Sequence, residues 1–543
     1  MVPGIKETWG SPACPLGGGV KNKIDLLRNV ALVAAAGYVE AAVGLLAGVF
    51  IARTLGPTDY GHYAFAVWLC GVLIMGGNHA LPTTSIKFVA EARGAGRLDV
   101  AAALAQRLSR LQTASSLLVL SIFAVVMLLA PLADWRDSLP LMLCTAVVAV
   151  WARASFWMRG AIGKGFELFV PENLALALTA LLNLVLVSAL AWRGASVEHF
   201  FILYALLGLV STALVRWLLR RSEAIPAVSG AIPDETQRRL RRHLVLTGIV
   251  MLIVLATNRA VEMTLLKIYT TPEVVGYFAI AGALTKGAVD LLGGGMSAVL
   301  LPSMSRRFGS GGASALGGML SEATRLYWFI GLFIAGLGLT VSDDLVHLLY
   351  GSRYDGAIPV LLWQLAVAGL LMVNGASAAV LTASDRQLDR IRVLVCALVV
   401  NLAFGLWLIP RFGLNGAIAS MALTQLCETA FAWWYARRRT RVIYPFGAMA
   451  RLAVAAFIAG ALSLLLTHAL HAALGFLVGA TVFIGIYLLL SVLLRTWRAG
   501  EFELAAELLG RLGSVGGRLS KRVLGLKRYA LPDLEDAGRD ANG

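Results

Sequence analysis

Long apolar segments recur along almost the whole chain and constrain its fold more than any other feature. Fourteen apolar runs of about 20 residues each lie between residues 30 and 494. A run of this length, folded as a helix, spans the roughly 30 Å hydrocarbon core of a bilayer. Fourteen such runs in 543 residues leave almost no sequence for a soluble domain. The sequence therefore predicts an all-α polytopic membrane protein whose function lies within its helix bundle.

The bounds of the predicted spans follow from these runs. They are 30–52, 62–82, 112–132, 139–158, 169–192, 199–219, 244–267, 275–301, 325–346, 359–382, 391–409, 413–436, 447–468 and 472–494. Residues 1–29 lack an apolar stretch ahead of a small-residue cleavage site, so we expect the first span to act as an uncleaved insertion signal. The five cysteines are odd in number and four lie in apolar runs, which indicates neither a disulfide framework nor a metal site.

The distribution of positive charge predicts the orientation of the chain. A net charge of +16 at first suggests a nucleic-acid partner. If the N-terminus lies in the cytoplasm, however, the inside segments hold 39 of the 47 Lys and Arg residues and the outside turns hold 6. This split follows the positive-inside rule, and basic cytoplasmic segments are attracted to anionic lipid. We therefore expect both termini in the cytoplasm, membrane lipids as partners and no nucleic acid.

The two halves of the chain resemble each other in order. Residues 57–66 read PTDYGHYAFA and residues 272–281 read PEVVGYFAIA, so Pro, Gly, an aromatic residue and Ala recur at an offset of 215. Further weak matches follow at offsets of 218 to 220, and their collinearity is the evidence. Spans 1–6 and 7–12 are predicted to be two six-helix repeats. Because six is even, the repeats are parallel and surround a central cavity, as in transporters that work by alternating access.

This repeat divides the chain into six predicted parts. They are a cytoplasmic N-terminal segment (1–29), an N-terminal six-helix bundle (30–219), a cytoplasmic basic linker (220–243), a C-terminal six-helix bundle (244–436), two additional transmembrane helices (437–494) and a cytoplasmic basic tail (495–543).

Four predicted spans carry polar or charged side chains well inside their limits. A charge in hydrocarbon costs at least about 2.5–3.5 kcal/mol, so these residues are functional candidates. They are Glu40 in the first span, Asn258, Arg259 and Glu262 in the seventh, Lys286 and Asp290 in the eighth, and Gln425 and Glu428 in the twelfth.

The spacing of these charges allows two interpretations. Arg259 and Glu262 lie three residues apart, and Lys286 and Asp290 lie four apart, so each pair can neutralise itself on one helix. Alternatively, the charges face a watery cavity, and the glycines beside Lys286 form its wall. A stripe of glycines also suits close helix packing. The sequence leaves both interpretations open.

Three short motifs resemble those of a known family. Residues 52–61 read ARTLGPTDYG, residues 349–354 read LYGSRY and residues 410–417 read PRFGLNGA. They resemble the aRxLGpxxyG, lyGxxY and PxfGxxGAA patterns of the Wzx-type oligosaccharide flippases. This family belongs to the multidrug/oligosaccharidyl-lipid/polysaccharide (MOP) exporter superfamily. The resemblance covers about residues 25–440 and fits the predicted repeat.

The resemblance implies a flippase in the bacterial cytoplasmic (inner) membrane. It would move an undecaprenyl-diphosphate-linked oligosaccharide to the periplasmic leaflet for surface polysaccharide, such as O-antigen or exopolysaccharide, alongside the polysaccharide polymerase machinery. Arg259, Lys286 and Asn258 would bind the diphosphate, and Glu40, Glu262, Asp290 and Glu428 would balance charge or couple transport. No cofactor is implied beyond coupling to H⁺ or Na⁺, and the sequence has no GxxxxGK[ST] phosphate loop for ATP.

Other functions remain alternatives at this stage. A lipid II flippase or a cation-coupled multidrug antiporter of the same superfamily would share the fold. Basic residues among the buried acids favour an anionic substrate over a cationic drug. A membrane glycan polymerase or ligase is more distant, because the predicted outside turns are all short and leave no room for a catalytic loop. We therefore expect a transporter and not an enzyme, with no catalytic residues and no metal site.

Overall fold

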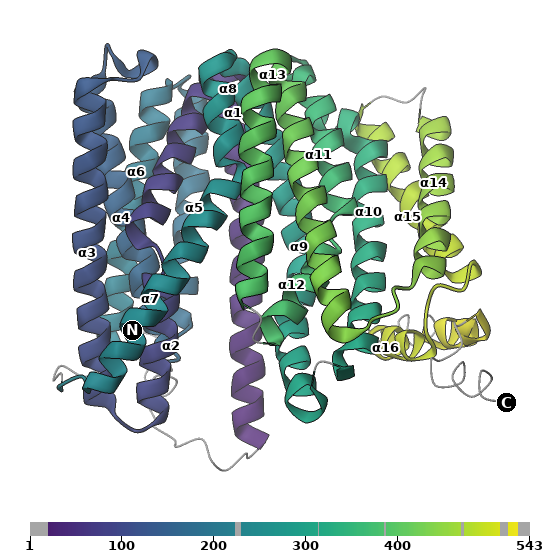
Figure 1. Ribbon diagram of the computed structural model, residues 1–543. Helices are drawn as coiled ribbons and strands as arrows, with labels where there is room; N and C mark the ends of the chain where they lie inside the picture. Colours follow the sequence, from purple (N-terminus) through teal and green to yellow (C-terminus); the bar gives the residue numbers. More distant parts are fainter. Residues whose placement is uncertain are drawn as a thin grey trace, which may run out of the picture. The chain divides into compact units, whose positions relative to one another are not determined.

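Helices account for the regular structure of the protein. The computed structural model describes residues 20–222, 230–312, 314–384, 387–467, 472–510 and 520–529. Within these residues the elements are helices joined by turns and short loops, and none is a β-strand (Figure 1). The predicted all-α fold is confirmed. The predicted segments 1–29, 220–243 and 495–543 lie partly outside the described residues.

The helices follow one another along the chain with short connections. Their bounds are α1 Val20–Asn78, α2 Leu81–Gly94, α3 Leu98–Leu129, α4 Leu139–Gly165, α5 Val170–Trp192, α6 Val197–Arg221, α7 Asp234–Leu255, η3 Ala256–Ala260, α8 Val261–Tyr269, α9 Pro272–Gly311, α10 Gly317–Leu349, α11 Ile358–Leu370, α12 Asn374–Ala383, α13 Gln387–Thr440, α14 Phe446–Thr467, α15 Ala472–Leu493 and α16 Ala499–Gly510.

Ten helices in the described part of the chain are long and apolar enough to cross a membrane. A bent pair, Ser352–Leu370 with Asn374–Ala383, adds an eleventh if its two parts form one span. Two of the ten, α1 and α13, are interrupted by non-helical glycines, Gly56 and Gly413, and each contains two of the predicted spans. A total of fourteen is compatible with these bounds, and the number stays a prediction.

The outer surface of the helices is rich in large apolar side chains. Leu129 is 81% exposed, Trp192 90% and Phe457 77%. An apolar surface of this extent is unfavourable in water and matches the hydrocarbon of a bilayer. Surface exposure and span length therefore lead to the same conclusion, that the protein crosses a membrane many times.

The chain forms two compact units. The first comprises residues 1–279 and 405–414, and the second comprises residues 280–404 and 415–543. The helices α7 and α8, which we expected to begin the second repeat, belong to the first unit. The predicted division into two six-helix bundles with a linker therefore stays a prediction, and each unit is described by itself.

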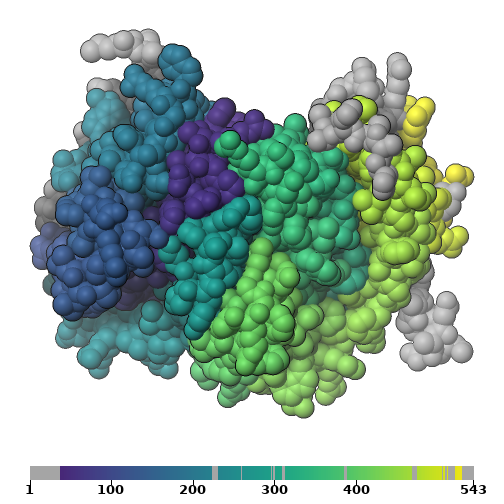
Figure 2. All heavy atoms as spheres, turned by 90° about the horizontal axis from the view of Figure 1, so that it is seen from above, coloured from purple at the N-terminus to yellow at the C-terminus, as the bar shows by residue number. Residues whose placement is uncertain are grey.

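Aromatic packing attaches the last two spans to the second unit. Phe483 and Tyr487 on α15 stack on each other, and the Tyr487 hydroxyl donates a 2.9 Å hydrogen bond to the Phe329 carbonyl of α10. Both α15 side chains are fully buried. Viewed from above, the yellow-green α14 and α15 lie at the edge of this unit (Figure 2).

Two glycines of the first unit make a reciprocal contact. Gly61 on α1 and Gly276 on α9 occupy equivalent places in the predicted repeat. A Cβ added at Gly61 would overlap the Pro272 carbonyl oxygen, and one added at Gly276 would lie 2.7 Å from the Pro57 carbonyl oxygen. Equivalent residues that touch each other across a twofold axis are the mark of an isologous contact. This contact is what a pseudo-twofold between the repeats would produce.

Turn glycines recur at a similar spacing. Gly96 and Gly312 both have positive φ (74° and 66°) and lie 216 residues apart. Gly194 and Gly413 have φ of 63° and 53° and lie 219 residues apart. A positive φ is strained for residues with a Cβ, which explains glycine at these turns. The structure thus adds two matches to the offsets of 215 to 220 seen in the sequence.

We expect Gly61→Ala to lower the stability of the protein by about 1–3 kcal/mol, since the methyl group would push α1 away from the backbone of α9. Gly71→Ala is the matched control, because a Cβ at this position of α1 meets nothing within 4 Å. In a helix this change is neutral or stabilising by up to about 1 kcal/mol. Thermal unfolding in detergent measures both, and equal melting temperatures would contradict the close contact.

Candidate functional site

The seventh predicted span is not a regular helix where its polar residues occur. The backbone changes from α7 to a π-helical segment, Ala256–Ala260, and then to α8. Asn258 and Arg259 lie in this segment, although their side chains are outside the described part of the structure. Single π-helical turns inside helices are rare and are frequent at functional sites. The irregular backbone therefore supports the prediction that this part of the span has a function.

Glu262 lies one turn beyond the π-helical segment, in the first turn of α8. Its side chain is buried, with 1% of the residue exposed. A carboxylate at such a site is costly unless it is paired. Burial agrees with the predicted charge-balancing role for Glu262 and does not test its pairing with Arg259.

Lys286 and Asp290 are brought together on α9. The ammonium group of Lys286 forms an ion pair and a hydrogen bond with a carboxylate oxygen of Asp290, one helical turn away. The two side chains are 73% and 62% exposed within the structure. Of the two interpretations of this pair, the structure shows the neutralising contact. The exposure means that neither charge is enclosed by neighbouring helices.

Glu428 lies beside a break in another span. Its Oε1 accepts a 2.8 Å hydrogen bond from Nδ2 of Asn374, the first residue of α12. The chain between α11 and α12 forms turns, and the two helices meet at 43°. Non-helical backbone at membrane depth is tolerated where it lines a cavity or is buried in protein. Asn374 was not singled out in the sequence, because an isolated asparagine gives no signal of a helix break.

A cluster in the first unit surrounds Glu40. This residue of α1 lies within electrostatic reach of Arg153 on α4 and Glu172 on α5. The Arg153 guanidinium stacks 3.7 Å from the centre of the Tyr204 ring and donates a hydrogen bond of 3.3 Å to the Tyr204 carbonyl. The sequence analysis did not single out Arg153 and missed this cluster, because its members lie far apart along the chain.

Glu172 is the most deeply buried carboxylate of this cluster. It is 3% exposed, and its Oε1 lies 2.9 Å from the Lys164 ammonium. Gly160 makes room for it, since a Cβ there would lie 2.5 Å from Glu172 Oε2. Lys164 and Glu172 lie on either side of the turn between α4 and α5. The ion pair therefore fixes the geometry of this helical hairpin.

A second ion-pair cluster lies in a predicted outside turn. The Oδ2 atom of Asp134 accepts a hydrogen bond from Lys267 and lies 2.8 Å from Nδ1 of His62. Burial raises the pKa of Asp134, but the hydrogen bonds from Lys267 and His62 outweigh burial, so the pKa lies below the ordinary carboxyl value. This cluster joins the turn after α3 to α8 and to α1.

No group of three or more His, Cys, Asp or Glu side chains able to hold a metal occurs among the residues that the structure describes. Polar residues instead lie in membrane-length helices, and Asn258, Arg259 and Asn374 lie at irregular backbone. Polar residues at breaks of membrane-length helices are typical of polytopic transporters.

Two family profiles each match more than half of the chain. The profile of the polysaccharide biosynthesis protein family matches residues 26–308, and that of the lipid II flippase MurJ family matches residues 181–493. The chain belongs to the flippases of the MOP superfamily that these families represent. The three sequence motifs predicted a flippase of the MOP superfamily, and this prediction is confirmed. No curated protein sequence matches the chain.

Solved structures share the fold at low sequence identity. The lipid II flippase MurJ in an inward closed conformation has a TM-score of 0.67 and 11% identity, covering 85% of this chain and 98% of its own. An inward-facing multidrug resistance MATE family transporter of the MOP superfamily has a TM-score of 0.61 and 15% identity, covering 74% and 94%. A MATE transporter from Vibrio cholerae has a TM-score of 0.56 and 14% identity, covering 77% and 96%.

We expect Lys164→Met to destabilise the protein by about 3–5 kcal/mol, because it leaves the buried Glu172 carboxylate unpaired. The exposed pair of Arg239 and Glu91 is the matched control, with side chains 51% and 42% exposed. Arg239→Met should cost at most about 1 kcal/mol. Thermal unfolding in detergent measures both variants. The added change Glu172→Gln should recover part of the loss, and its failure to do so would contradict an ion pair as the cause.

Proposed function

We propose that this protein is an alternating-access flippase of the bacterial cytoplasmic membrane, with both termini in the cytoplasm. Its substrate would be an undecaprenyl-diphosphate-linked oligosaccharide, moved to the periplasmic leaflet for surface or secreted polysaccharide. The polymerase machinery would then receive the flipped units. The match of the polysaccharide biosynthesis profile to residues 26–308 supports this substrate class.

The observation that carries the proposal is the π-helical segment at Arg259 within a span. Moving a diphosphate across about 30 Å of hydrocarbon requires a compensating cation on its path. Arg259 can bind phosphate oxygens through two parallel hydrogen bonds, while Lys286 supplies a point charge. Asn258 would donate a further hydrogen bond from the same segment. Widened backbone at such a position is suited to presenting these groups to a ligand.

The acidic residues have a separate role in this proposal. Asp290 neutralises Lys286 in the structure, so an arriving diphosphate would replace one anion by another at the lysine. Glu262 would do the same for Arg259. Glu40 and Glu428 lie at the other two polar sites and would carry a coupling H⁺ or Na⁺. Coupling of this kind needs neither a nucleotide nor a bound metal cofactor.

A lipid II flippase is the second candidate, because the MurJ profile matches residues 181–493. Its substrate would present the same polyprenyl diphosphate to Arg259 and Lys286, so the residues do not separate the two candidates. The consequences of gene loss distinguish the two candidate functions. A cation-coupled multidrug antiporter is the third candidate, favoured by the likeness of the fold to MATE transporters.

We expect deletion of the gene to abolish display of a surface or secreted polysaccharide. Lipid-linked repeat units should accumulate on the cytoplasmic leaflet, because synthesis continues while translocation stops. Polysaccharide staining together with extraction of lipid-linked glycans measures both, with a plasmid copy of the gene as control. Lysis with accumulated lipid II would favour the second candidate, and sensitivity to cationic drugs with normal polysaccharide would favour the third.

Charge substitutions test the proposed diphosphate site. Arg259→Ala and Lys286→Ala should each abolish export while the protein inserts at normal levels, and Arg259→Lys and Lys286→Arg should keep part of the activity. If the charges only neutralise each other, removing both members of a pair should restore function. We therefore compare Arg259→Ala/Glu262→Ala and Lys286→Ala/Asp290→Ala with the single changes. Restored export in a double variant would refute the diphosphate role of that pair.

A further inference from the structure

A basic cavity lies within the second unit, at the end of the helices that the charge distribution assigns to the cytoplasm. Its volume is about 630 Å³, within the usual range for ligand-binding pockets. The first three turns of α10, the end of α13, the loop that follows it, the start of α14 and Arg498 line it. None of the residues proposed for the diphosphate site lines it, so the cavity is a separate feature of the molecule.

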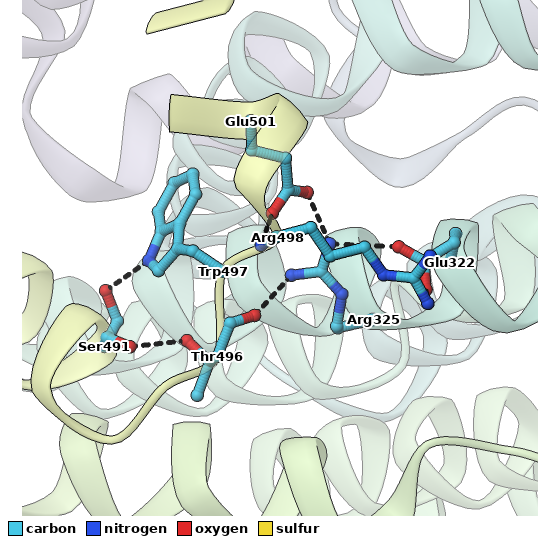
Figure 3. Close-up of polar contacts among 7 residues, drawn as sticks. All are labelled: Glu322, Arg325, Ser491, Thr496, Trp497, Arg498 and Glu501. Carbon is cyan, nitrogen blue, oxygen red and sulfur yellow. Dashed lines mark hydrogen bonds and ion pairs between the residues drawn. The ribbon is translucent and has the colours of Figure 1, made fainter. Parts of the chain in front are cut away.

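The cavity carries a surplus of positive charge. Four arginines and one glutamate line it, namely Arg325, Arg441, Arg451, Arg498 and Glu322. Glu322 is already engaged by Arg325 and Arg498. Glu501, which lies next to the cavity, pairs with Arg325 and accepts a 2.8 Å hydrogen bond from the backbone N–H of Arg498 (Figure 3). Even with Glu501 included, positive charges outnumber negative ones by two.

Arg325 is held rigidly in this cavity. It is 3% exposed, and one of its guanidinium nitrogens donates a hydrogen bond of 2.5 Å to the Thr496 carbonyl (Figure 3). Its Nε has no hydrogen-bond partner among the described residues. Because this Nε is itself buried, an anion in the cavity would interact with the charge of the guanidinium and would not contact this N–H.

Two helices begin at the cavity and add to its positive potential. The first turns of α10 and α14 contain no acidic residue. Gly318 and Gly447 lie in these turns, and a Cβ at either position would meet nothing within 4 Å. The backbone is therefore open at Gly318 and Gly447, whereas a Cβ at the neighbouring Gly317 would lie 3.0 Å from the Thr440 carbonyl oxygen. Helix N-termini carry partial positive charge and bind phosphate groups through backbone N–H donors.

The rim of the cavity is apolar and highly exposed. Ile443 is 87% exposed and Phe446 is 61% exposed, and both line the cavity together with Arg441 and Arg451. Exposed apolar side chains beside basic ones suit the boundary between lipid headgroups and acyl chains. A soluble anion would use the arginines and would have no use for this rim.

We propose that this cavity binds the phosphate of an anionic phospholipid from the cytoplasmic leaflet. The phosphate lies among the arginines and helix N-termini, and the acyl chains leave over Ile443 and Phe446. Arg325 of α10 also binds Glu501 of α16 and the Thr496 carbonyl. A phosphate bound beside Arg325 therefore stabilises the packing of the start of α16 on α10. The proposal uses the predicted orientation of the chain and does not depend on which substrate is transported.

The test uses the full-length protein, purified and delipidated in detergent, with native mass spectrometry as the readout. Phosphatidylglycerol is titrated against an equal concentration of phosphatidylcholine. Wild type should retain phosphatidylglycerol, and Arg441→Gln/Arg451→Gln should bind it at least about tenfold more weakly, since each basic residue near the membrane contributes roughly a fivefold factor. Arg241→Gln/Arg242→Gln is the control, because it removes the same charge from exposed positions on the same predicted face, outside the cavity.

Arg441→Gly separates a binding defect from a folding defect. Arg441 has φ of 52°, a conformation that glycine adopts without strain, so the variant should fold at least as well as wild type. We expect it to keep its melting temperature without added lipid and to bind phosphatidylglycerol about fivefold more weakly. Unchanged binding in this variant and in the double variant would overturn the proposal. Equal retention of phosphatidylcholine would also overturn it, and displacement of the lipid by millimolar inorganic phosphate would assign the cavity to a soluble anion instead.

Discussion

The absence of water from the hydrocarbon core determines most of this structure. Every backbone N–H and C=O in a span must find its partner inside the protein, which leaves the helix as the form of each described span. Departures from the helix within spans are costly and therefore informative. Two departures in the described part of the chain are the π-helical segment Ala256–Ala260 and the turn between α11 and α12. Both coincide with polar residues that have no place in a purely structural span, namely Asn258 and Arg259 in one case and Asn374 in the other.

Ion pairs among the described residues differ in burial and in what they join. Glu172 with Lys164, and Arg325 with Glu322 and Glu501, each contain a side chain that is almost fully buried. They join helices or loops, and breaking them would leave a buried charge unpaired. Lys286 and Asp290 differ, because both belong to α9 and both are more than 60% exposed. A pair that joins nothing adds little to the fold, and its position in a span then needs another explanation.

Features with a local pattern were predictable from the sequence, and long-range pairs were not. Span positions follow from runs of apolar residues, and the contact between Lys286 and Asp290 follows from their spacing of one helical turn. The only sequence signal of the breaks at Gly56 and Gly413 is a glycine next to a proline or a bulky residue. Such neighbours are common at helix ends, so they did not identify the breaks. The pairing of Arg325 with Glu501 joins residues 176 positions apart, so no periodicity reveals it. The π-helical segment is equally hidden, because its backbone results from packing and not from an unusual composition.

The overlap of the two family profiles bears on which part of the chain recognises the substrate. Both profiles include residues 181–308, and this shared stretch contains Arg259, Glu262, Lys286 and Asp290. Lipid II and lipid-linked polysaccharide precursors differ in their sugars and share a polyprenyl diphosphate. Residues that contact the shared group should lie in the shared stretch, whereas residues that distinguish the glycans should lie outside it. Under the proposed function, the charged residues at Arg259 and Glu262 and on α9 would serve the diphosphate, and the identity of the glycan would be decided by polar side chains elsewhere, such as those around Glu40 and Glu428.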